Sequence, residues 1–128
     1  MRVAIVGAGS IGAVIGARLA SVGHEVVLVA RGAHLEAIRR DGVKLVDHVG
    51  SAGGVYRLAA SSDPADFKAQ DLVVIGLKAH AIAAMLPRIA PLVGSDTVVL
   101  PAINGLPCRC CHLFGHPDAH RCEEARRD

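Results

Sequence analysis

The sequence predicts an α/β fold with a doubly wound, mainly parallel sheet. Short apolar runs rich in valine and isoleucine alternate with segments of helical periodicity, as expected for buried strands joined by helices. A glycine-rich turn follows the first of these runs. The chain has 128 residues, of which 52% are hydrophobic and 20% charged, so it is long enough for one globular domain.

The first half of the chain begins with a β-branched run at residues 2–6, which predicts a strand covered on both faces. Apolar residues then recur at near-helical spacing over 10–22. A second apolar run at 25–30 predicts the next strand, and a short helix is expected over 33–42. Residues 43–60 predict two strands around a Gly/Ser turn.

The second half opens with an Asp-Pro pair at 63–64, which is a helix-start signal: aspartate caps the first turn, and proline fits the first helical position. A strand is predicted at 71–77, followed by a helix at 79–93 that Pro87 kinks or restarts. The last apolar run, 96–107, predicts a strand that runs into a loop. Strands that alternate with helices form a parallel sheet, whose ligands bind beyond the carboxyl ends of the strands.

Residues 7–12, with the sequence GAGSIG, match the G-x-G-x-x-G pattern between a predicted strand and a predicted helix. The first glycine permits the tight turn, the second lets the backbone approach a pyrophosphate, and the third lets the helix pack closely. A tight turn without a ligand is the alternative, but the context predicts a Rossmann-like dinucleotide site. The loop residues expected to bind the cofactor are Gly7, Ala8, Gly9, Ser10, Ile11 and Gly12.

Arg31 occupies the place where a carboxylate would indicate NAD or FAD, about 20 residues past the loop. No acidic residue follows it before Glu36. A guanidinium pairs with a 2′-phosphate through two hydrogen bonds, so the sequence favours NADPH over NADH and disfavours a flavin. The alternative is that Arg31 is a solvated turn residue.

Three segments in unbroken order resemble the N-terminal domain of the ketopantoate reductase family over residues 1–107. They are the stretch from the glycine loop through "ARG" and "HLEAIR", then "DLVVIGLKAHAI", then "LPAINGLP". The resemblance implies that Arg31 holds the 2′-phosphate of NADPH. It places Lys78 near the cofactor ribose or the substrate, and Asn104 at the junction of nicotinamide and substrate. A surface lysine and a turn asparagine remain the alternatives, and His80 is expected to be a surface histidine at a helix start.

Members of this family transfer a hydride from NADPH to a small-molecule 2-keto acid, reducing 2-dehydropantoate to pantoate in pantothenate biosynthesis. A second, helical domain supplies the proton-donating lysine of the family. The lysines of this chain, Lys44, Lys68 and Lys78, all fall in the first domain. The resemblance therefore implies the cofactor-binding part of an oxidoreductase, inactive alone, with a complementing helical domain or self-association as partner. A non-catalytic NADP(H)-binding regulatory module is the alternative, because one fold serves many functions.

The segment 108–128 departs from the family pattern and is expected to be a poorly ordered tail. It contains all four cysteines, Cys108, Cys110, Cys111 and Cys122, together with several histidines. These are zinc-type ligands, but their spacing lacks paired C-x₂-C units, so no metal site is assigned.

The net charge of +2, without a lysine-rich cluster, gives no electrostatic case for a nucleic acid or a membrane surface. Glycines at fixed spacing and Arg18 interrupt the first apolar stretch, which disfavours a signal peptide. No apolar run approaches the roughly 20 residues of a membrane span. A cytoplasmic location is therefore expected.

Overall fold

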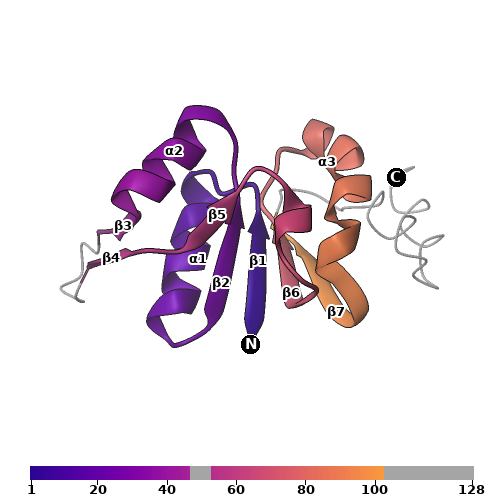
Figure 1. The fold of residues 1–128 in the computed structure, drawn as a ribbon, viewed down its shortest axis with the longest axis horizontal. Helices are drawn as coiled ribbons and strands as arrows, with labels where there is room; N and C mark the ends of the chain where they lie inside the picture. The colour runs from indigo at the N-terminus through magenta and orange to yellow at the C-terminus, as the bar shows by residue number, and fades with distance from the viewer. Residues whose placement is uncertain (47–52, 103–128) are drawn as a thin grey trace, which may run out of the picture.

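A computed structural model of the protein describes residues 1–46 and 53–102. Its main sheet has five parallel strands in the order β5-β2-β1-β6-β7 (Figure 1). This arrangement confirms the predicted doubly wound parallel sheet. The strands are β1 (Arg2–Val6), β2 (Glu25–Val29), β5 (Ala59–Ser61), β6 (Gln70–Ile75) and β7 (Val93–Pro101).

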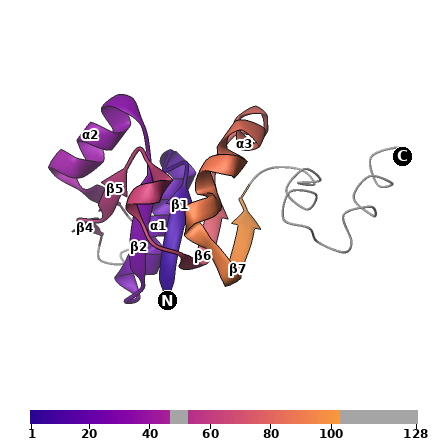
Figure 2. The ribbon, with the colours of Figure 1, turned by 45° about the vertical axis from the view of Figure 1, so that its right-hand side comes forward.

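Helices cover both faces of the sheet and create two hydrophobic clusters. One cluster includes buried residues of α1 (Ser10–Ser21) and α2 (Gly32–Asp41). The other includes buried residues of α3 (Ala79–Met85) and of the 3₁₀ helix η2 (Leu86–Leu92). In Figures 1 and 2, α2 and α3 accordingly lie to either side of β1.

Strand β1 lies in the middle of the sheet and contributes to both clusters. Val3 and Ile5 point to the α1 face, whereas Ala4 and Val6 point to the α3 face, and none of the four is exposed to solvent. An apolar strand without alternation is therefore what this position requires. The next strand in the chain, β2, lies on one side of β1 and β6 on the other, so the strand order reverses between β1 and β6.

The described residues 43–46 and 53–61 contain three strands, where two were expected over 43–60. β3 (Val43–Leu45) and β4 (Gly54–Tyr56) make an antiparallel hairpin that packs against α1. The third strand, β5, joins the main sheet by pairing with β2. The prediction was wrong because β5 has a weak local signal, Ala-Ala-Ser, and is held by its pairing with a distant strand.

The remaining elements follow the predictions, with shifted ends. The Asp63 side chain accepts a hydrogen bond of 3.1 Å from the Ala65 N–H and caps η1 (Pro64–Asp66), a single 3₁₀ turn. The predicted helix over 79–93 is divided into α3 and η2, with Pro87 at the start of η2, which confirms the expected restart. β7 begins earlier than predicted, at Val93.

An ion pair joins β1 and β6 at the amino edge of the sheet. The Asp71 carboxylate accepts hydrogen bonds from the Arg2 backbone N–H (2.7 Å) and guanidinium (3.1 Å). The backbone hydrogen bond, followed by the guanidinium, holds the pKa of Asp71 below its ordinary value. None of the helices within residues 1–46 and 53–102 is long and apolar enough to cross a membrane.

Replacing Leu28 of β2 with alanine is expected to lower the free energy of unfolding by about 2–5 kcal/mol, because its side chain is fully buried. Leu100→Ala in β7 makes the same chemical change at a side chain that is 52% exposed, and should cost less than about 1 kcal/mol. Urea denaturation of both variants measures the difference. Equal costs would contradict the assignment of the core.

Candidate functional site

The glycine loop leaves the carboxyl end of β1 and turns directly into α1. Gly7 has φ +89°, a left-handed conformation that a side chain disfavours. A Cβ atom there would lie 2.6 Å from Leu77 Cδ2. The N–H groups of Gly7 and Ala8 both donate to the carbonyl oxygen of Val29, at 3.0 and 3.2 Å. The loop is thereby tied to the end of β2.

Gly12 brings α1 into backbone contact with this loop. A Cβ atom at Gly12 would lie 2.5 Å from the Gly7 carbonyl oxygen and 3.1 Å from Ile5 Cγ2, so a side chain does not fit. Gly16, one turn later, packs against β2 in the same way, with Leu28 Cδ2 3.0 Å from the position of a Cβ. These two glycines hold the start of α1 directly over the end of the sheet.

The N-terminus of α1 presents backbone donors that no side chain occupies. Gly9 is the N-cap and supplies no capping group, and the first intrahelical bond runs from Ala13 N–H to the Gly9 carbonyl (2.8 Å). The N–H groups of Ser10, Ile11 and Gly12 therefore have no partner within the helix. A Cβ at Gly9 would meet nothing within 4 Å. Open space beside free N–H groups at a helix N-terminus suits a phosphate group.

Arg31 lies at the same edge of the sheet, where it is the N-cap of α2. Its side chain is exposed, and its Nη2 lies 3.9 Å from Sδ of Met85, the last residue of α3. The guanidinium thus extends from the β2–α2 connection toward the α3 side of the sheet. The next acidic residue, Glu36, lies 3.9 Å from Arg39 on the outer part of α2.

Lys78 follows β6 and is the exposed N-cap of α3, with its carbonyl oxygen accepting a hydrogen bond from Ala81 N–H (2.9 Å). His80 is exposed on the first turn of α3. The structure therefore places the glycine loop, Arg31 and Lys78 at the carboxyl edge of one sheet. Asn104 and the segment 108–128 lie outside the described residues.

Two residues at this edge were not predicted from the sequence. Gly76, directly after β6, donates its N–H to the Val6 carbonyl (2.8 Å), and a Cβ there would lie 3.0 Å from the Gly7 carbonyl oxygen. His34, in the first turn of α2, contacts the Ala8 carbonyl oxygen through its Nε2. A glycine immediately after a buried strand was the available signal for Gly76, whereas nothing local indicated the partner of His34.

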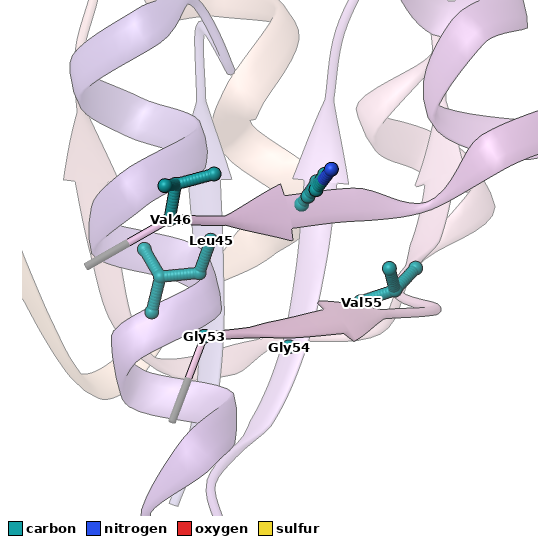
Figure 3. Close-up of a pocket in the computed structure, with 6 residues that line it drawn as sticks. Leu45, Val46, Gly53, Gly54 and Val55 are labelled. Carbon is teal, nitrogen blue, oxygen red and sulfur yellow. The ribbon is translucent and has the colours of Figure 1, made fainter. Parts of the chain in front are cut away.

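A hollow on the surface lies elsewhere, at the β3–β4 hairpin (Figure 3). Its lining residues are Lys44, Leu45, Val46, Gly53, Gly54 and Val55. The lining is mainly apolar and includes none of the residues of the carboxyl edge. Across the part of the chain that the structure describes, no group of three or more histidine, cysteine or acidic side chains is arranged to hold a metal.

Comparison with known proteins agrees with the geometry of the glycine loop and the strand ends. The family model described as Ketopantoate reductase PanE/ApbA matches residues 3–108. The chain belongs to the ketopantoate reductase family. It is 42% identical over 118 residues to a 2-dehydropantoate 2-reductase of Mesorhizobium japonicum, a match that covers 91% of this chain and 36% of that protein.

Solved structures of ketopantoate reductases have the same fold. The 2-dehydropantoate 2-reductase of Geobacter metallireducens superposes with a TM-score of 0.79 at 34% identity, covering 89% of this chain and 38% of that one. A D-mandelate dehydrogenase solved with NADH and anilino(oxo)acetate has a TM-score of 0.74 at 27% identity, covering 90% and 36%. The chain thus spans little more than a third of the length of these relatives.

The two glycines at the start of α1 should respond differently to alanine. Gly12→Ala is expected to lower the midpoint of urea denaturation strongly, because its Cβ would collide with the backbone oxygen of Gly7. Gly9→Ala should leave the midpoint nearly unchanged, because its φ of −68° suits any residue and its surroundings are open. A Gly12→Ala protein as stable as wild type would contradict the close packing of α1.

Proposed function

We propose that the chain is the cofactor-binding part of an NADPH-dependent reductase of 2-keto acids, with 2-dehydropantoate, which is reduced to pantoate, as the substrate. The family membership supports the reaction class. The observation that carries the choice of NADPH is Arg31, an exposed guanidinium at the end of β2, in the connection where NAD-binding proteins place a carboxylate.

The residues of the carboxyl edge suit the successive parts of a dinucleotide. The free N–H groups of Ser10 and Ile11 bind the diphosphate, where the positive end of the α1 dipole adds to the attraction. Arg31, which follows β2 in the chain, pairs with the 2′-phosphate. The bound cofactor supplies the hydride, and the protein orients it.

Lys78 lies on the other side of the loop from Arg31, because β6 and β2 flank β1. This position supports the proposal that its ammonium group contacts the ribose near the nicotinamide or the carboxylate of the keto acid. By family resemblance, Asn104 hydrogen-bonds at the junction of nicotinamide and substrate. The proton donor and most of the substrate pocket are supplied by the remainder of the reductase, since the Mesorhizobium enzyme is matched over only 36% of its length.

Arg31→Ala is expected to weaken NADPH binding by about ten- to a hundredfold, the usual loss when a charged hydrogen-bond partner of a phosphate is removed. Affinity for NADH, which lacks the 2′-phosphate, should change less than about threefold. Isothermal titration of the 128-residue chain with each cofactor measures the ratio. Arg40→Ala is the matched control, because it removes the same charge from the exposed far end of α2.

An unchanged ratio of NADPH to NADH affinity in Arg31→Ala would remove the basis for NADPH. If the wild-type chain binds NADH more tightly than NADPH, the proposed cofactor is NADH, which is the cofactor in the solved structure of D-mandelate dehydrogenase.

Gly9→Ala tests the diphosphate site separately from the fold. Apart from the adjacent residues of the chain, no protein atom lies within 4 Å of the added methyl group, which projects into the space where the diphosphate is proposed to bind. NADPH affinity should fall at least about tenfold while the unfolding midpoint is retained. Wild-type NADPH affinity in this variant would show that the cofactor does not approach the loop.

A further inference from the structure

His34 contacts a backbone carbonyl group of the glycine loop. No pattern in the sequence predicted this contact. Its Nε2 lies against the carbonyl oxygen of Ala8, the residue between Gly7 and Gly9. Ala8 is only 1% exposed, so its carbonyl needs a partner inside the protein. The N–H of the same residue donates to Val29 (3.2 Å). Both backbone polar groups of Ala8 are therefore held by the segment that runs from β2 into α2.

In this contact only one of the two groups can donate the hydrogen bond. A carbonyl oxygen only accepts hydrogen bonds, so Nε2 of His34 must carry the hydrogen. The neutral imidazole with its hydrogen on Nε2 meets that requirement. An amide N–H₂ at the same reach also meets it, whereas a thioether or a methyl group does not.

We propose that His34 is a positioning residue for the cofactor, acting through the glycine loop. By donating to the Ala8 carbonyl, it fixes residues 7–9 in the conformation that presents the N–H groups of α1 to the diphosphate. Because His34 lies three residues after Arg31, the same turn of α2 carries the 2′-phosphate ligand and the support of the diphosphate loop. This inference rests on the proposed function.

The rest of α2 does not depend on the imidazole. Leu35 and Ile38 are each only 5% exposed and pack in the α1-side cluster, and Arg39 Nε donates to the Ala60 carbonyl (3.1 Å). Removing the His34 side chain therefore leaves α2 anchored and Arg31 in place. Without the imidazole the glycine loop is less ordered. Part of the binding free energy of the cofactor is then used to order this loop, and the affinity falls.

Two ligands separate this role from a general structural one. NADPH engages both the loop and Arg31, whereas adenosine 2′-monophosphate carries the 2′-phosphate without the diphosphate. In the 128-residue chain, His34→Ala should weaken NADPH binding about tenfold, as expected when one partly buried hydrogen bond is lost. Binding of adenosine 2′-monophosphate should stay within about twofold of wild type.

Two substitutions of similar size to histidine, glutamine and methionine, control for the possibility that the alanine variant misfolds. His34→Gln keeps an N–H donor at similar reach and should restore NADPH affinity to within about threefold of wild type. His34→Met has similar size without a donor and should bind like His34→Ala. His24→Ala is the matched control, because it removes an imidazole just before β2, at the amino edge of the sheet, and should alter neither affinity.

The outcomes distinguish this inference from the function on which it rests. Wild-type NADPH affinity in His34→Met, or an equal loss of both ligands, overturns the role of His34 and leaves the proposed function standing. A wild-type chain that binds no NADPH overturns both. Loss of NADPH alone, rescued by glutamine and not by methionine, establishes the positioning role.

Discussion

The contact between the start of α1 and the end of β1 is the constraint on which the rest of this structure depends. The Gly7 carbonyl oxygen is so close to Gly12 that not even a methyl group fits between them. This contact brings the first turn of α1 to the edge of the sheet, where the N–H groups of Ser10, Ile11 and Gly12 have no partner within the helix. The same contact also determines how closely Gly16, one turn later in α1, packs against β2. A longer side chain at either glycine would lift the helix from the strands.

The loop is shaped by both neighbours of β1 and not by its own sequence alone. The Val29 carbonyl at the end of β2 accepts hydrogen bonds from two N–H groups of the loop. Gly76, which follows β6, packs against the carbonyl oxygen of Gly7. The conformation of the glycine loop therefore depends on the order of the strands in the sheet as well as on the glycines. Because neither α1 nor α2 begins with a capping side chain, the groups proposed to bind the cofactor at this edge are backbone N–H donors and the cations of Arg31 and Lys78.

The elements that could be predicted from the sequence are those whose signals are local. The GAGSIG turn, the apolar strands and the Asp63 cap depend on near neighbours, and each was predicted in its place along the chain, although β7 begins earlier than expected. Strand β5 was missed because it is held by pairing with Val27–Val29 rather than by its own residues. The approach of Arg31 to Met85 and the contact of His34 with Ala8 join different elements, so no spacing along the chain could have predicted them.

The central place of β1 also bears on the order in which the chain folds. β1 and β2 are connected through α1 alone, so the β1–α1–β2 unit closes a short loop. The pairing of β1 with β6 joins Val3 to Leu72 and has to wait for a much longer closure, which topology makes slow. Gly76 reaches the glycine loop only in that late step. The carboxyl edge around the glycine loop is therefore complete only when the long-range pairing of β1 with β6 has formed.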